Sequence, residues 1–156
     1  MIYAMTALTD KLAAEGERTA AFFTALPAEH HDAPVYPHGA AWSVRQTLEH
    51  LIVSERSLLT VFRDVAGGGP GAPAALEIES FNHSHTGALA HLSFDELIDA
   101  FLTQRQETTT FARTLSDEQL VCSGRHPALG QTTLLEMLRL VPLHNSMHLR
   151  DLRKAL

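Results

Sequence analysis

Apolar residues recur along this chain at the three- and four-residue spacing of an amphipathic α-helix, in four long stretches. The first stretch runs from about Met5 to Leu26 and stops before Pro27, and the second begins at Ser43 and ends by Gly67. One apolar stripe on each helix has to be buried against other helices. Because runs of alternating β-branched residues are nearly absent, the pattern predicts an all-α fold.

The third and fourth stretches cover residues 93–115 and 133–156. The predicted helix starts carry capping boxes, in which a Ser or Thr oxygen accepts the backbone N–H three residues later and a Glu or Gln there reaches back. These boxes begin at Ser43, Ser93, Ser116 and Thr133. The box at Ser116 predicts a short helical turn of its own. Four long helices with additional short helical segments predict a four-helix bundle.

The segments between the helices are rich in Pro and Gly. Residues 27–41 and the region around Gly124, Pro127 and Gly130 are predicted to be loops. The glycine-rich segment 67–71 is predicted to be a mobile surface loop; it lacks the Lys-Ser or Lys-Thr ending of a phosphate-binding loop. Residues 76–92 form either a short helix or an extended linker.

Composition narrows the class of protein. A length of 156 residues predicts a single domain over residues 1–156. The net charge of −6 and the absence of a basic run argue against a nucleic-acid partner. No basic and apolar leader is visible, and no apolar run approaches the roughly 20 residues of a membrane span, so we expect a cytoplasmic protein without a membrane partner. A single cysteine excludes an internal disulfide and a four-cysteine zinc site.

Ten histidines are the unusual feature of the composition, and two of them are spaced for metal binding. His144 and His148 lie one helical turn apart, so both imidazoles can bind one ion. By itself the pair is more often a surface or core feature. Pro142 lies two residues before His144 and is either a tolerated kink or a break that shapes a pocket.

Two residues of the second predicted helix have more than one interpretation. His50 lies off the centre of the apolar face, and by itself it would be an exposed residue. Glu55 lies near the middle of that face, where a buried carboxylate needs a partner. Glu55 is therefore either part of a structural ion pair, which we favour, or a group that orients a metal-binding histidine.

The remaining histidines lie mostly in predicted loops, and most of them are expected to be exposed to solvent. One of His83 and His85 could reach the open end of the bundle and line a pocket. Trp42 is expected to pack where the first loop meets the second helix. The other histidines concerned are His30, His31, His38, His91 and His126.

Two segments resemble the DinB-like (DinB/YfiT) superfamily. Residues 42–51, Trp-Ser-Val-Arg-Gln-Thr-Leu-Glu-His-Leu, followed by Glu55, are similar to the signature of its second helix. Residues 132–136, Thr-Thr-Leu-Leu-Glu, leading to His144 and His148, are similar to its last helix. The two segments occur in the family's order, and the resemblance covers nearly the whole chain. The sequence departs from the family's pattern at Pro142 and at residues 145–147. These departures affect the lining of the pocket more than the metal ligands.

The resemblance implies an up-up-down-down four-helix bundle that can form a homodimer. It also implies one divalent transition metal ion (nickel, zinc or iron) at one end, bound by His50, His144 and His148. Characterised members of the family include S-transferases and isomerases that use bacillithiol, mycothiol or glutathione. The family's historical association with DNA damage finds no support in the acidic charge of this chain.

A site with three histidine ligands leaves one metal position open for water or substrate, which favours catalysis over a structural role. The first hypothesis is a metal-dependent transferase that activates a low-molecular-weight thiol for attack on a small electrophilic substrate. The second is a stress-related protein that binds metal or a partner without turnover. The third is a metal-dependent hydrolase, distinguished by turnover without thiol. The sequence identifies no general base.

Overall fold

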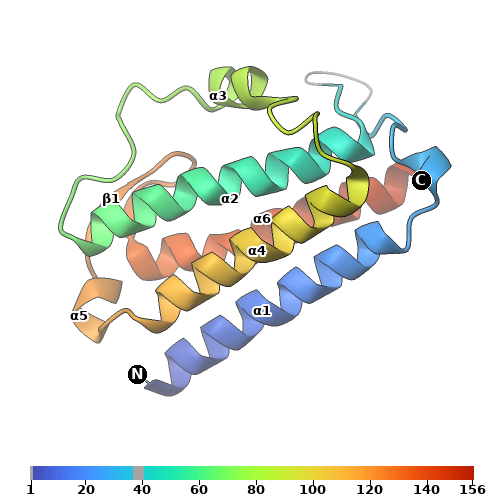
Figure 1. Cartoon of the computed structure of the whole chain (residues 1–156). Helices are drawn as coiled ribbons and strands as arrows, with labels where there is room; N and C mark the ends of the chain where they lie inside the picture. The colour runs from blue at the N-terminus through green and yellow to red at the C-terminus, as the bar shows by residue number, and fades with distance from the viewer. Residues whose placement is uncertain (1, 37–40) are drawn as a thin grey trace.

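The computed structural model describes residues 2–36 and 41–156, and its main feature is a bundle of four long helices (Figure 1). These are α1 (Ile2–Thr24), α2 (Val44–Ala66), α4 (Phe94–Arg113) and α6 (Leu134–Ala155). Two short helices, α3 (Ile78–His85) and α5 (Asp117–Leu120), and a 3₁₀ turn at Ala28–His30 lie in the connections. The predicted all-α four-helix bundle is confirmed, and residues 76–92 contain the short helix rather than an extended linker.

The helices run in two directions (Figure 1). Phe23 near the end of α1 packs on Phe94 at the start of α4, so these two helices are antiparallel. Arg45 at the start of α2 donates to the carbonyl of Leu92 just before α4, so α2 and α4 are parallel. Around the bundle the arrangement is the expected up-up-down-down. Along the chain the order is up, down, down, up, because residues 67–93 return over the length of the bundle.

Helix starts follow the predicted capping boxes. Ser43, Ser93 and Ser116 each accept the backbone N–H three residues on, and the side chain there bonds back to the serine N–H. At Thr133 only one bond of the capping box forms, from the Glu136 N–H to the Thr133 side chain. The Glu136 carboxylate pairs with Arg139 instead of bonding back to the Thr133 N–H. Each cap satisfies N–H groups that have no partner within the helix, and therefore fixes where the helix begins.

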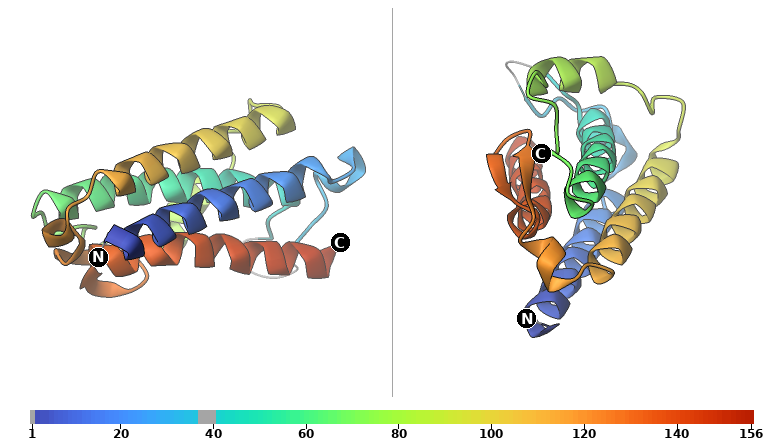
Figure 2. Two further views of the ribbon diagram at one scale, coloured as in Figure 1. Left: turned by 90° about the horizontal axis from the view of Figure 1, so that it is seen from below. Right: turned by 90° about the vertical axis from the view of Figure 1, so that its left-hand side faces the viewer.

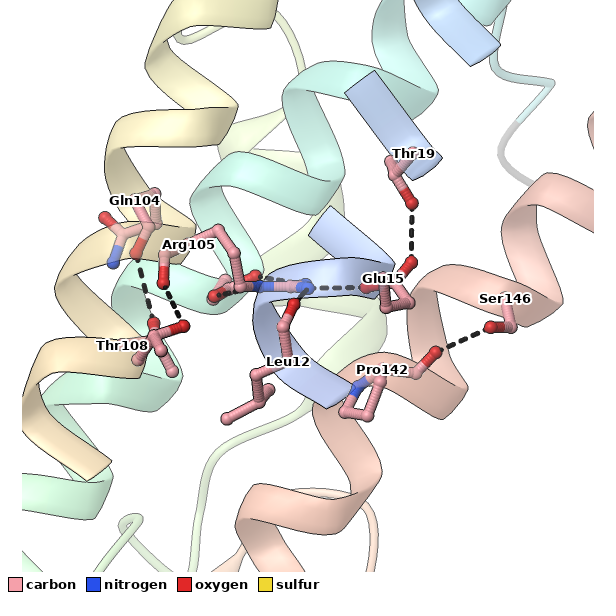
Figure 3. A network of polar contacts seen from close by, with 10 residues as sticks. Leu12, Glu15, Thr19, Gln104, Arg105, Thr108, Pro142 and Ser146 are labelled. Carbon is pink, nitrogen blue, oxygen red and sulfur yellow. Dashed lines mark hydrogen bonds and ion pairs between the residues drawn. The ribbon is translucent and has the colours of Figure 1, made fainter. Parts of the chain in front are cut away.

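The core consists of two apolar clusters, one at each end of the bundle. One cluster includes Phe23, Leu51 and Phe101, and the other includes Leu12, Phe62 and others such as Met137, Leu138 and Val141. Between them lie buried polar side chains from α1, α2 and α4 (Figure 3). Helices α1 and α2 each supply residues to both clusters, so one face of each of these two helices is buried along most of its length.

Arg105 is the centre of this buried polar layer. Its guanidinium donates two hydrogen bonds to the Glu55 carboxylate, at 2.9 and 3.0 Å, and further bonds to Glu15 and to the Leu12 carbonyl. Burial disfavours its charge, but the two carboxylates outweigh burial and raise the pKa of Arg105. Gly16 gives it room, since a Cβ there would come within 2.6 Å of the Arg105 side chain. The structural interpretation of Glu55 is thus confirmed.

A β-hairpin forms where only a loop was predicted. Strands β1 (Ser123–His126) and β2 (Gly130–Thr133) pair in antiparallel register beside the start of α6 (Figure 2). The glycine-rich segment is bonded to this hairpin through Ala72 N–H to the Arg125 carbonyl and Arg125 N–H to the Pro70 carbonyl. Gly71 has φ +83°, and a Cβ there would meet the Arg125 backbone at 2.5 Å. The segment lies largely at the surface, as predicted, but these bonds join it to the hairpin; its mobility stays a prediction.

Among the described residues, no helix combines the length and apolar character that crossing a membrane would require. The long helices instead pack their apolar stripes on one another. Two of them, α2 and α6, provide the side chains considered next.

Candidate metal centre

Three histidines from two antiparallel helices converge at one position. His50 comes from the second turn of α2, and His144 and His148 come from successive turns of α6. The His144 Nε2 lies 3.3 Å from the His50 Nε2 and 3.1 Å from the His148 Nε2. One ring nitrogen of each lies within 4.8 Å of the others. The three histidines singled out in the sequence are therefore brought together.

This donor set fits a divalent transition metal ion. Two nitrogens bound at about 2.1 Å in a tetrahedral arrangement lie about 3.4 Å apart, close to the two nitrogen separations found here. Imidazole suits zinc, nickel and iron, so the donor set does not select among them. Three ring nitrogens brought together from two helices are the kind of donor set that such an ion requires.

A hydrogen bond on the opposite ring nitrogen orients the His148 imidazole. The Nδ1 of His148 lies 2.8 Å from the Tyr36 hydroxyl, which donates to the Asp151 carboxylate at 3.3 Å. In that arrangement His148 donates from Nδ1 to the tyrosine oxygen and keeps the Nε2 lone pair free. The Ser54 hydroxyl lies 3.2 Å from the His50 Nδ1 and 3.4 Å from its Nε2, so this contact does not select one nitrogen of the ring. A contact such as that between Tyr36 and His148 fixes the tautomer and the ring orientation of a metal-binding histidine.

The environment keeps these rings neutral. Burial, and then the charges of His144 and His148, lower the pKa of His50 to about 3. Burial, followed by His148 and His126, lowers the pKa of His144 to about 4. Burial also lowers the pKa of His148, although Asp151 opposes the shift. A neutral imidazole has a lone pair, so the rings are ready to bind a cation near pH 7.

A cavity of about 270 Å³ lies directly beside the three histidines. Apolar side chains of α2, α6 and the segment around α3 make most of its wall, including Leu58, Val61, Leu76, Ile78, Phe81 and Val141. Polar groups are few, and among the described residues that line the cavity none is Asp, Glu, Lys or Arg. The site therefore combines a metal-binding corner with an apolar chamber, the usual composition of a small-molecule site.

The histidines outside the cluster agree only in part with the expectation that they are exposed to solvent. His83, His85 and His91 are exposed, as expected. His85 borders only a hollow of about 10 Å³ beside His50, while Phe81 and Asn82 of the same helix line the main cavity. His38 lies outside the described residues. His30 and His31 are half-buried, and the His31 ring stacks on Phe94.

His126 contradicts the expectation that loop histidines are exposed. It is 3% exposed and lines the cavity. The physical reason is the unpredicted hairpin, since alternate residues of a strand point to one face and Gly124 and His126 of β1 both point inward.

Sequence reasoning also missed two aromatic residues at the centre. Tyr36, in the predicted loop, gave no local signal for its bond to His148. Trp42 packs at the loop–helix junction as expected, with 7% exposure, but its ring also lies 4.5 Å from the His50 ring. In the sequence, the only indication of this contact was that Trp42 lies eight residues before His50. Helix α6 continues through Pro142, and its neighbours Leu140 and Val141 line the cavity.

Comparison with known proteins places the fold. The sequence model of the DinB superfamily matches residues 11–152. A solved structure, YfiT from Bacillus subtilis, superposes with a TM-score of 0.79 at 18% sequence identity, covering 97% of this chain and 85% of YfiT. That protein is described as a probable metal-dependent hydrolase with an unusual four-helix bundle topology. No curated protein matches the sequence.

Proposed function

Since this chain belongs to the DinB superfamily, we propose that it is an enzyme that binds one divalent transition metal ion on His50, His144 and His148. We further propose that the ion activates a low-molecular-weight thiol, or water, for attack on a small substrate. The observation that supports this most directly is the convergence of three neutral imidazoles at the wall of the 270 Å³ cavity.

A structural zinc site is closed by four protein ligands, whereas a catalytic site has three and an open position. Among the described residues, the cluster contains three potential ligands. When bound, a divalent ion supplies Lewis acidity and lowers the pKa of a water or thiol at its open position toward neutrality. An apolar chamber beside that position limits access of bulk water and strengthens electrostatic interactions inside.

The residues of the chain have separable tasks in this proposal. His50, His144 and His148 hold the ion, and Tyr36 orients His148 through Nδ1. Trp42 packs against the His50 ring and closes one side of the cluster. No carboxylate lines the cavity among the described residues, so the proton of the attacking group has to leave by way of solvent.

Two nucleophiles remain candidates, each with its own support. A thiol as nucleophile follows from the family resemblance and gives an S-transferase. Water is favoured by the cavity, which has no Lys or Arg among its described lining residues to bind the carboxylate of an anionic thiol. The description of the similarly folded YfiT as a probable hydrolase agrees with water. We place the thiol first and hydrolysis second.

The first test is elemental analysis of tag-free protein purified without chelator. We expect about one equivalent of transition metal. A His144→Ala/His148→Ala variant should contain little, and a His83→Ala/His91→Ala variant, which removes two exposed histidines, should match the parent. Parent protein that stays empty after incubation with nickel, zinc and iron would refute the metal site.

The second test separates the nucleophiles. Metal-loaded protein is assayed with monochlorobimane plus glutathione, bacillithiol or mycothiol, and with 4-nitrophenyl esters without thiol. Thiol-dependent turnover supports the transferase, and thiol-independent ester cleavage supports the hydrolase. Bound metal with neither activity would favour the remaining alternative, a metal-binding protein without turnover.

A further inference from the structure

His126 is a buried polar side chain without a task in the site described above. It lies at the end of β1, is 3% exposed, and lines the same cavity as the three histidines. Its Nε2 is buried and has no hydrogen-bond partner among the described residues. Buried polar atoms in native proteins almost always have a partner, so an unpaired atom on a side chain that lines a cavity requires an explanation.

The hydrogen bonds on the other side of the ring determine what Nε2 offers. The backbone N–H groups of Ala128 and Leu129 both donate to the His126 Nδ1, at 3.1 and 3.2 Å. Nδ1 is therefore an acceptor, and the proton of the neutral ring is on Nε2. Burial lowers the pKa of His126, which agrees with a neutral ring near pH 7. The unpaired atom is thus a hydrogen-bond donor.

The hairpin holds this donor in a fixed position. His126 pairs with Gly130 across β1 and β2, and Arg125, next to it, is bonded on its other side to residues 70–72. Gly124 faces Val65 of α2 so closely that a Cβ would come within 2.3 Å of it. The donor is therefore part of a rigid wall, as precise ligand binding requires.

The rest of the cavity restricts the ligand that this donor can meet. Most of the wall is apolar, and no described lining residue has a charged carboxylate, ammonium or guanidinium group. Away from the three-histidine corner, an anion would lose its hydration without gaining a counter-charge. An uncharged molecule with an apolar body would be favoured by burial alone.

We propose that His126 is a substrate-binding residue whose Nε2–H donates to an uncharged oxygen acceptor, such as a carbonyl, of a substrate with an apolar body. This names the substrate class of the site and rests on the proposed function for the reaction. The binding contact itself requires no metal. A carbonyl held between the donor and the three-histidine corner would be placed beside the nucleophile.

The test uses two probes of similar shape, acetophenone with a carbonyl oxygen and ethylbenzene without one. Their dissociation constants are measured by NMR titration for the metal-free and the zinc-loaded full chain. The variants are His126→Phe, which keeps the ring and removes the donor, and His126→Gln, which returns an amide donor. His91→Phe, which makes the same change at an exposed histidine outside the cavity, is the matched control.

We expect His126→Phe to raise the Kd of acetophenone relative to that of ethylbenzene by roughly three- to tenfold, the worth of one neutral hydrogen bond. His126→Gln should restore part of the preference, and His91→Phe should leave it unchanged. Because a purely structural role would weaken both probes equally, the ratio of the two constants isolates the hydrogen bond. In unmutated protein the His126 Nε2–H resonance should shift with acetophenone and not with ethylbenzene.

Three results would overturn the proposal. The first is an unchanged ratio of the two dissociation constants in His126→Phe together with an unshifted Nε2–H resonance. The second is a carbonyl preference that appears only with zinc and persists in His126→Phe, and the third is failure of both probes to bind unmutated protein. Failure of the proposed function looks different. In that case metal binding or turnover is absent, while the carbonyl preference of the metal-free protein still depends on His126.

Discussion

The neutral histidines make the metal-free protein sensitive to mild acid. The pKa values of His50 and His144 are lowered by burial to about 3 and about 4. In the unfolded chain both titrate near about 6.5. Between these values the unfolded state binds more protons than the folded state. The stability is therefore complete above about pH 6.5 and falls as the pH drops toward the folded pKa values.

The size of the effect follows from the pKa difference. At about pH 5.5 the unfolded form of each histidine gains roughly 1.4 kcal/mol from protonation, while the folded forms of His50 and His144 stay neutral. Together the two histidines lower the free energy of unfolding by about 3 kcal/mol, a large share of the roughly 5–15 kcal/mol that stabilises a typical domain.

The assay is urea unfolding of chelator-treated protein, followed by circular dichroism, at about pH 7.5 and about pH 5.5. A His50→Asn/His144→Asn variant removes both titrating groups. We expect its stability relative to the parent to improve by about 3 kcal/mol at the lower pH, since carboxylate titrations cancel in the difference. A His83→Asn/His91→Asn variant, which changes exposed residues, should track the parent. A change below about 1 kcal/mol would refute the inference that the folded protein holds these rings neutral.

Three further substitutions test the structure around the site. Arg105→Met leaves two buried carboxylates without their cation and should lower the free energy of unfolding by about 3–5 kcal/mol in urea titrations; a loss below about 1 kcal/mol would contradict the network. Tyr36→Phe removes the partner of His148 and should weaken zinc binding roughly 10- to 100-fold in competition with a chelating dye, and an unchanged affinity would show that the hydroxyl does not orient the ring. Gly71→Ala introduces a Cβ against the Arg125 backbone at positive φ and should cost more than about 1 kcal/mol, with faster hydrogen exchange in the hairpin; unchanged exchange would argue against the tie between loop and hairpin.

Local signals made the helices predictable. Capping boxes involve groups three residues apart, and apolar stripes repeat every three or four, so both can be recognised within one segment. The predicted starts at Ser43, Ser93 and Ser116 coincide with observed caps for this reason. The hairpin was missed because its strands are only four residues long and β1, Ser-Gly-Arg-His, has none of the β-branched or aromatic residues typical of strands.

The candidate site was only partly predictable. The spacing of His144 and His148 suggested a ligand pair, but their spacing alone could not distinguish a metal site from a surface pair. His50 was added through the family resemblance, because its position on the helix indicated an exposed residue. Nothing local indicated Tyr36 or the buried side of His126, since these depend on where a loop and a hairpin pack.

The sequence by itself determined which segments are helical, where most helices start, and that histidines are the candidate chemistry. The tertiary structure decided which groups meet: Tyr36 contacts His148 across 112 positions of sequence, and Arg105 contacts Glu15 across 90. It also decided that His126 lies inside and that Glu55 belongs to an ion pair. The reason is the separation in sequence of the groups that interact. Helix formation depends on neighbours within about one turn, whereas burial and charge pairing depend on distant segments that only the packed bundle brings together.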